Sequence, residues 1–508
     1  LSHWLCLLPV LLRPDAREVL VIGLGGGTAI ESLPATVARI DVVELEPEVV
    51  AANRVIAAAR ARDPLADPRV RIHLGDARGA LQLTAKRYDA IVSQPSHPWT
   101  AGASHLYTRE FFALVRERLS PDGVFVQWIG LPFVDELLLR SLLATLDEVF
   151  GHVQLYWSGE RGVLFAASAA PLTPLATAAQ ALRATPGDFA RFGVDRLEDF
   201  AGAWQLDEEG SRAFARGEAL NTDDRNQLAS RASRLGDRSL DVGFLRGLVA
   251  ERDPLRAHAE GIDRAVLLRI LAERGSELRA MDLARAETGA DGERAQGWVE
   301  LANSRPRNAA RHFERARELA PGDGEALVGL VASRKSELAR GAVPEIPERE
   351  LAAPIAAVIA GWRAAARGEW PAVAAIDAEL ARNVPGDALY REATRLRAQW
   401  RVERGDPGAA ADAAEILAAM LRSSWEGEGA LLHARAAIVA GQIEVAWTAL
   451  DRIADLAPPT ERGRDLARRA LVLVERLPED AARRVRDPLE RRAEARPRRP
   501  DRAGVKAH

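Results

Sequence analysis

Cysteine is almost absent from the 508-residue chain, which contains Cys6 and no second cysteine. A single cysteine excludes an internal disulfide and any zinc cluster built from cysteine ligands. The chain also lacks a large excess of one charge. Its 69 Lys and Arg nearly balance its 73 Asp and Glu, which gives a formal net charge of −4. This balance argues against a general nucleic-acid binder, and nothing in the sequence predicts a metal site.

Long apolar runs are absent as well. Residues 5–12 are apolar but far short of the roughly 20 residues that cross a bilayer. This segment is either a truncated signal sequence or a helix packed on the edge of a sheet. No small-residue cleavage site follows it, which favours the helix. The chain begins at Leu1, so we expect a fragment or a processed product. We expect a cytoplasmic location, with membrane association only through upstream sequence missing from this chain.

The length predicts two or three domains. We assign residues 1–170 to a Rossmann-like nucleoside-binding domain and 171–262 to a helical extension of it. Residues 263–490 form an α-helical repeat region, and the basic tail 491–508 lacks apolar periodicity and is expected to be disordered.

A strand, a glycine loop and an acid follow one another near the start. Residues 19–22 form an apolar run typical of a buried parallel strand. The loop 23–28 contains Gly23, Gly25, Gly26 and Gly27, and Glu44 ends the next strand about 20 residues downstream. Glycines let the backbone approach a ligand, and a carboxylate can accept both ribose hydroxyls. The alternative is a structural tight turn, and we favour a nucleoside site.

Further apolar runs continue the pattern of strands separated by helices. The expected strands are 41–44, 70–74, 88–93 and 123–128, and the expected helices include 47–62 and 108–119. This order predicts an α/β fold with a mostly parallel, methyltransferase-type sheet. Ligands of such sheets lie at the carboxyl ends of the strands, where the loop 23–28, Glu44, Asp76 and 94–99 converge. Residues 153–157 and 162–167, joined by 158–161, predict an added antiparallel pair.

Between residues 172 and 235 the pattern indicates short helices with polar joints. Here Asn-Thr-Asp-Asp-Arg at 221–225 offers two alternatives. The carboxylates could bind a cation or an amine, whereas such clusters commonly make turns and helix caps, which we favour.

From about residue 263 onward, strand patterns vanish and alanine-rich amphipathic helices dominate. Ala309, Phe313, Ala316 and Pro321 have the spacing of a tetratricopeptide second helix and its closing proline. The same spacing recurs in Ala446, Leu450, Ile453 and Pro458. We predict helix pairs stacked as a solenoid with Ala309, Phe313 and Ala316 buried; the alternative is an unrelated helical bundle.

Several motifs together resemble the spermidine synthase (polyamine aminopropyltransferase) family. They are Val-Leu-Val-Ile-Gly-Leu-Gly-Gly-Gly-Thr (19–28), Val-Glu-Leu-Glu-Pro (43–47), Asp-Pro-Arg-Val (67–70), Gly-Asp-Ala (75–77), Tyr-Asp-Ala-Ile-Val (88–92) and 101–112. The chain most resembles a bacterial branch that is often fused to membrane segments and carries the sequences found here at 95–99 and 221–225. The resemblance covers about 11–231, under half of the chain.

The resemblance implies that the glycine loop and Glu44 hold the ribose end of decarboxylated S-adenosylmethionine or of the methylthioadenosine product. It implies that Asp76, followed by Ala77, holds the adenine. The donor would be a co-substrate, so no permanently bound cofactor is expected, and a polyamine would be the acceptor.

The chain departs from the family where the amine should bind. Typical members carry Asp where this chain has Gly26, and their two loop Asp residues are matched by Gln94 and His97. The amino-terminal β-domain of the family is absent. Gln94 can orient an amine but cannot accept its proton, whereas His97 can titrate near neutrality. Gln94 and His97 are therefore the candidate catalytic residues, with a structural role for His97 as the alternative.

Three functions remain open. The leading hypothesis is a divergent aminopropyltransferase with an altered amine site. The second is methyl transfer from S-adenosylmethionine, which uses the same kind of sheet and ribose carboxylate. The third is a catalytically inactive nucleoside-binding scaffold whose helical repeats dock a protein partner.

Overall fold

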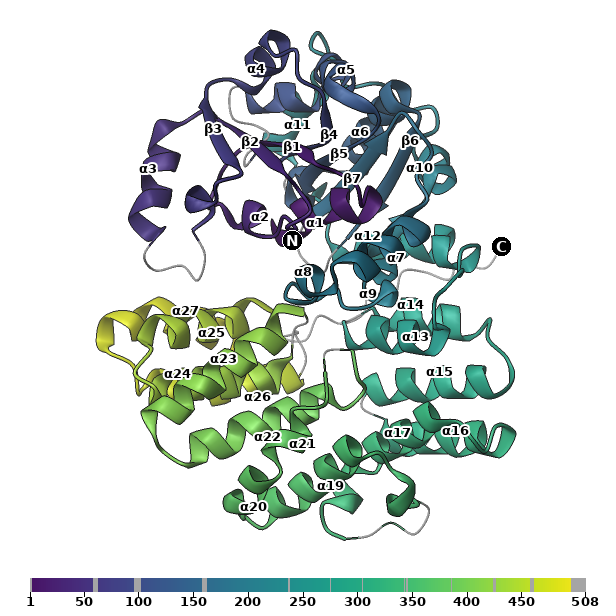
Figure 1. Cartoon of the computed structure of the whole chain (residues 1–508), viewed down its shortest axis with the longest axis vertical. Helices are drawn as coiled ribbons and strands as arrows, with labels where there is room; N and C mark the ends of the chain where they lie inside the picture. The colour runs from purple at the N-terminus through teal and green to yellow at the C-terminus, as the bar shows by residue number, and fades with distance from the viewer. Residues whose placement is uncertain are drawn as a thin grey trace. The chain divides into compact units, whose positions relative to one another are not determined.

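The computed structural model describes residues 2–57, 63–95, 102–157, 162–235, 238–274, 276–303, 305–341, 343, 346–384, 386–423, 426–456 and 461–494. The chain divides into two compact units, Leu1–Asn303 and Ser304–His508 (Figure 1). The strands of the described residues all belong to the first unit, and the second is built from helices.

An eight-stranded sheet, counted over the described residues, forms the centre of the first unit. Its strands are β1 Glu18–Ile22, β2 Arg39–Glu44, β3 Val70–Leu74, β4 Tyr88–Ser93, β5 Leu119–Gly130, β6 His152–Tyr156, β7 Gly162–Ser168 and β8 Trp204–Leu206. Their order is β3-β2-β1-β4-β5-β7-β6-β8. The first five are parallel, while β7, β6 and β8 pair antiparallel. The sheet confirms the expected Rossmann-like, methyltransferase-type fold.

Apolar side chains on both faces explain why these runs form a buried parallel sheet. Val19 and Val21 pack on one face, whereas Leu20 and Ile22 pack on the other. The first face is covered by α1 Ser2–Leu12, α2 Thr28–Glu31, α7 Pro174–Ala184 and α9 Leu197–Ala203. The second is covered by α4 Ala77–Leu83, α5 Arg109–Arg118, α6 Glu136–Phe150, α10 Glu208–Ala215 and α12 Val242–Arg252.

Strand β3 ends the sheet on one side. It pairs with β2 alone among the described strands. Arg71 and His73 are exposed, and Leu74 is 61% exposed. This outermost strand is therefore much less buried than its neighbours.

Helix α1 corrects one expectation. The sequence predicts a helix on the sheet edge, but α1 contacts β4, β5 and β7 and therefore lies over the middle of one face. Leu5, Leu7 and Leu8 are fully buried. A helix that is apolar on nearly every side needs cover all round, which α2 and α7 supply.

The antiparallel strands β6 and β7 were expected and are confirmed, although the residues that join them, 158–161, lie outside the described residues. Strand β8 was not expected, because its segment reads as short helices. It adds to the outside of β6 through Leu155 and Leu206. Helix α3 (Pro47–Ile56) occupies most of the predicted range 47–62, of which 58–62 lies outside the described residues.

The first unit continues to Asn303, past the domain boundary predicted at position 262. Helices α13 Arg264–Glu273, α14 Glu277–Ala284 and α15 Gly289–Ala302 pack against one another, and α13 contacts α9. Arg279 of α14 and Asp253 form a buried ion pair, and Arg279 also donates to the carbonyl oxygen of Trp204 in β8. These helices therefore share the core beneath the sheet.

The second unit consists of consecutive helices. They are α16 Pro306–Leu319, α17 Gly324–Ser333, α18 Lys335–Leu338, α19 Ala353–Ala366, α20 Trp370–Ala375, α21 Asp377–Leu380, α22 Tyr390–Glu403, α23 Pro407–Ser423, α24 Gly427–Val439, α25 Ile443–Leu456, α26 Glu461–Val474 and α27 Glu479–Glu494. From α22 to α26, helices contact the next one along the chain, and α22 contacts α24, which contacts α26. This pattern is typical of stacked helix pairs.

The predicted packing of α16 is confirmed. Ala309, Phe313 and Ala316 are fully buried, and α16 packs on α17. A Cβ at Gly329 of α17 would overlap the Phe313 ring, so the two helices approach closely there. Ala446, Leu450 and Ile453 are also buried, whereas Pro458 lies outside the described residues.

Helix α27 extends past residue 491, the predicted start of the disordered tail, and residues 495–508 lie outside the described residues. Leu489 and Ala493 are buried, so an apolar face carries the helix to Glu494. Within the described ranges, every helix is either too short or too polar to cross a lipid bilayer.

We predict that Gly329→Ala destabilises the second unit by about 1–3 kcal/mol, because the new methyl group must displace the buried Phe313 ring. Gly324→Ala in the same helix is the matched control. A Cβ there meets nothing within 4 Å, and alanine has the higher helix propensity. Urea unfolding of the full chain, followed by far-UV circular dichroism, measures both variants; equal effects would contradict the packing.

Candidate functional site

The carboxyl ends of four parallel strands lie along one edge of the sheet. Ile22 pairs with Val43 on one side and with Ser93 on the other, and Glu44 pairs with Leu74. The segments that follow these strands are the glycine loop, Glu44, Asp76 and Gln94. The structure therefore brings the described members of the predicted site to the same edge.

The glycine loop depends on glycine at particular positions. Gly23, Gly25 and Gly27 have positive φ angles of 92°, 50° and 75°, a conformation that other residues adopt only with strain. A Cβ at Gly23 would lie 3.1 Å from the carbonyl oxygen of Gln94. Gly26 differs, because a Cβ there would be in ordinary contact with Thr28 Oγ1 at 3.8 Å.

Glu44 joins the second strand to the glycine loop. Its side chain is 7% exposed, and Oε2 accepts a hydrogen bond from the Leu24 N–H at 2.8 Å. Oε1 accepts one from the Glu46 N–H at 3.0 Å. Each carboxylate oxygen can accept a further hydrogen bond. Glu44 can therefore hold the loop and still receive two donors from a ligand.

Asn53 of α3 is a loop-positioning residue that was not predicted from the sequence. Its Nδ2 donates to the carbonyl oxygens of Gly25 at 2.7 Å and Val49 at 2.8 Å, and the residue is 2% exposed. One polar side chain on the otherwise apolar face of the predicted helix was the available signal. The contact places α3 directly behind the loop.

Asp76 and Ala77 follow the third strand. Asp76 is exposed and caps α4, since its Oδ2 accepts from the Gly79 N–H at 2.7 Å. Its Oδ1 receives no hydrogen bond from the described residues, so it can accept one from a ligand. Ala77 is 7% exposed and packs into the core below.

The structure describes one of the two candidate catalytic residues. Gln94 is partly buried, and its backbone N–H donates to the carbonyl oxygen of Ile22 at 3.1 Å, which fixes it beside the glycine loop. His97 lies outside the described residues.

A pair of buried polar residues lies beside Gln94 and was also missed. Ser93 of β4 and Gln127 of β5 occupy paired positions and are both fully buried. Gln127 Nε2 donates to the Trp128 carbonyl oxygen at 3.2 Å. Neither Ser93 Oγ nor Gln127 Oε1 has a hydrogen-bond partner among the described residues. A glutamine inside the apolar run of β5 was the sequence signal for this pair.

Tyr107 lies close to these two residues. Its hydroxyl donates to the same Trp128 carbonyl oxygen at 2.9 Å, and burial raises the pKa of this phenol well above its usual range. Tyr107 therefore stays neutral and acts as a hydrogen-bonding group rather than as a base.

The motif at 221–225 forms a turn that is tied to the site edge. Thr222 and Arg225 hydrogen-bond through their backbones, and Asn226 caps α11 (Gln227–Arg231). The Asp223 carboxylate binds Arg78, so it is already engaged by a cation of the chain. These contacts match the turn-and-cap interpretation.

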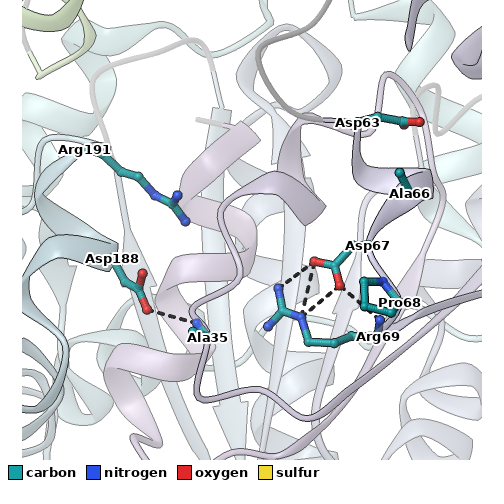
Figure 2. Close-up of a pocket in the computed structure, with 8 residues that line it drawn as sticks. All are labelled: Ala35, Asp63, Ala66, Asp67, Pro68, Arg69, Asp188 and Arg191. Carbon is teal, nitrogen blue, oxygen red and sulfur yellow. Dashed lines mark hydrogen bonds and ion pairs between the residues drawn. The ribbon is translucent and has the colours of Figure 1, made fainter.

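A separate pocket of about 510 Å³ lies at the opposite edge of the sheet (Figure 2). Its lining includes Ala35, which precedes β2, and Pro68 and Arg69, which precede β3. In Figure 2, Asp67 and Arg69 bind one another, and Asp188 accepts from the Ala35 N–H. The pocket is therefore distinct from the carboxyl-end site. The described residues contain no cluster of His, Cys, Asp or Glu suited to a metal ion.

Residues 2–159 match the family described as the spermine/spermidine synthase domain. The polyamine aminopropyltransferase of Nitrosomonas europaea is 35% identical over 151 residues, which are 29% of this chain and 46% of that protein. The enzyme of the same name from Synechococcus sp. (strain JA-2-3B'a(2-13)) is 35% identical over 144 residues, 28% of this chain and 46% of that protein. The chain thus spans just under half the length of these curated relatives.

Among solved structures, the spermidine synthase of Thermotoga maritima aligns over 49% of this chain and 74% of its own. The sequence identity is 18% and the TM-score is 0.32.

We predict that Gly23→Ala destabilises the first unit by about 1–3 kcal/mol, because alanine is strained at a φ of 92° and its methyl group crowds the Gln94 carbonyl. Gly26→Ala, in the same loop, should change the unfolding free energy little. Urea unfolding followed by tryptophan fluorescence compares the two variants. A Gly26→Ala effect as large as that of Gly23→Ala would contradict the loop geometry.

Proposed function

We propose that the first unit is an aminopropyltransferase with an altered amine site, on the premise that residues 2–159 match the spermine/spermidine synthase domain family. Its donor would be decarboxylated S-adenosylmethionine, its nucleoside product methylthioadenosine and its acceptor a polyamine. The observation that carries the proposal is the buried Glu44 carboxylate, which lies against the glycine loop with capacity for two more donors.

The ribose hydroxyls of the nucleoside would donate to Glu44, because both are donors and a carboxylate accepts them through two oxygens. The adenine amino group would donate to Asp76 at the end of the neighbouring strand. The positive φ angles of Gly23, Gly25 and Gly27 support close approach of the donor to the loop backbone.

In the proposed reaction the amine nitrogen of the acceptor attacks the aminopropyl carbon bound to sulfur. A nitrogen–carbon bond forms, the carbon–sulfur bond breaks, and the sulfonium becomes the neutral thioether of methylthioadenosine. The nitrogen loses a proton, which a base must accept. Gln94 can orient the amine but cannot take that proton, so we assign the base to His97.

Methyl transfer from S-adenosylmethionine is the second candidate function, and Gly26 is compatible with its donor. No carboxylate projects from position 26, so the loop does not repel the carboxylate that this donor retains. Calorimetry with decarboxylated and ordinary S-adenosylmethionine distinguishes the two functions, since the first predicts preference for the decarboxylated donor. Nucleoside binding without turnover of either donor would instead indicate an inactive scaffold.

For the second unit we propose a tetratricopeptide-like array that docks a protein partner. The buried Ala309, Phe313 and Ala316 and the succession of contacting helices from α22 to α26 support an array of helix pairs.

We predict that Glu44→Ala weakens methylthioadenosine binding at least tenfold. The substitution removes two charge-assisted hydrogen bonds, each worth about 1.5–3 kcal/mol. Glu46→Ala is the matched control, because Glu46 is exposed and contacts Glu44 through its backbone N–H, which alanine retains. Isothermal titration calorimetry measures both. Native affinity in Glu44→Ala would rule out this carboxylate as the ribose anchor.

We also predict that transfer activity rises with pH through a limb near 6.5, the ordinary pKa of imidazole, because the base must be neutral. His97→Ala should remove this limb and lower kcat more than it raises the KM of the nucleoside donor. Gln94→Asp combined with His97→Asp should increase putrescine-dependent activity. Rates measured with putrescine between pH 5 and 9 test the assignment, and an unchanged profile in His97→Ala would refute it.

A further inference from the structure

Residues 221–226 have no part in the proposed chemistry, yet they contact two segments beside the candidate site. The first segment is the start of α4, which Asp76 caps. The second is η3 (Ala103–Tyr107) together with the start of α5. These segments are far apart in the sequence from 221–226, so the contacts are tertiary rather than local.

Asp223 makes the central contacts. Its Oδ1 accepts from Arg78 Nη1 at 2.8 Å and its Oδ2 from Arg78 Nη2 at 2.8 Å, which is the two-pronged geometry of a strong guanidinium–carboxylate pair. Oδ1 also accepts from Thr108 Oγ1 at 2.7 Å and faces His105 Nδ1 at 3.3 Å. One carboxylate therefore contacts three side chains from two segments.

Backbone and amide contacts fix the turn that carries this carboxylate. The Asp223 N–H donates to Glu110 Oε2 at 2.9 Å, and the Arg109 N–H donates to the Asn221 carbonyl oxygen at 2.9 Å. Asn221 Nδ2 donates to the Tyr107 carbonyl oxygen at 2.9 Å, and Asn221 is 1% exposed. The turn is thus held along the whole start of α5.

The charge of Asp223 is matched to this position. The Arg78 guanidinium, helped by Thr108 and His105, holds the pKa of the Asp223 carboxyl far below its usual range. The carboxylate is therefore ionised near neutral pH. It also favours the His105 tautomer that carries its proton on Nδ1.

We propose that Asp223 is a positioning residue of the nucleoside site. It binds Arg78, the second residue of α4, and through Thr108 and His105 it sets where the Asp76 end of α4 lies relative to η3. This inference rests on the proposed function, because Asp76 is assigned there to the adenine amino group.

The test compares Asp223→Asn with Asp224→Asn. An amide at 223 loses the charge and turns one N–H group toward the Arg78 guanidinium, whereas Asp224 is exposed and makes none of these contacts. Isothermal titration calorimetry measures binding of methylthioadenosine and of methylthioinosine, which lacks the 6-amino group. The native protein should prefer the adenine ligand. Asp223→Asn should bind methylthioadenosine about tenfold more weakly and lose most of this preference, and Asp224→Asn should match the native protein.

The ratio of the two affinities separates positioning from a purely structural role. Lower stability alone reduces the folded fraction and lowers the apparent affinity for both ligands by the same factor. An unchanged ratio of the two affinities in Asp223→Asn would therefore overturn the inference. Arg78→Lys serves if Asp223→Asn does not fold, because lysine keeps the charge but loses the two-pronged geometry. Arg78→Lys should also reduce the preference for methylthioadenosine over methylthioinosine. A preference equal to that of the native protein would overturn the inference as well.

A double-mutant cycle on the same affinities adds a second criterion. If Arg78 and Asp223 act as one unit, Arg78→Gln with Asp223→Asn should weaken methylthioadenosine binding no more than the worse single variant. If the two single losses of affinity multiply in the double variant, the two residues act independently and the coupling is refuted. Failure of the native protein to bind either nucleoside would refute the proposed function itself, whereas native binding with an unaffected Asp223→Asn refutes this inference alone.

Discussion

The hydrogen bond between the Glu44 carboxylate and the Leu24 N–H is the contact on which the candidate site depends. It joins the end of β2 to the loop that follows β1 and provides the acceptor for the Leu24 N–H. Because the carboxylate is buried, it needs this donor to offset its desolvation. The loop shape also depends on the positive φ angles of its glycines, and the Asn53 contact with Gly25 places α3 behind the loop.

The parallel strands could be predicted closely from the sequence. The expected ranges 70–74 and 88–93 coincide with β3 and β4, because apolar, β-prone residues between turn signals leave little alternative. The site edge followed from the same pattern, since parallel strands separated by helices place their carboxyl ends together. Buried Phe313 could be predicted for a similar reason, because its neighbours recur at helical spacing.

What the sequence could not reveal are contacts between distant segments. The position of α1 over the sheet depends on its contacts with α2 and α7. Strand β8 forms by pairing with the outer side of β6. Asn53 matters because it binds the distant Gly25 carbonyl oxygen. Gln127 stands out because its Oε1 has no hydrogen-bond partner among the described residues. Local periodicity carries no information about such pairs. The site therefore was predictable as an edge of the sheet and not as a set of hydrogen bonds.

The position of β3 has a consequence for how the site would respond to a ligand. As the terminal strand, β3 has backbone amides on its outer side that no described strand covers, and such amides exchange with solvent more readily than those of central strands. Asp76 follows this strand, whereas Glu44 belongs to its better protected neighbour. A nucleoside bound to both residues would connect this terminal strand to the interior of the sheet. Nucleoside binding would then slow amide hydrogen exchange in β3, away from the atoms that react.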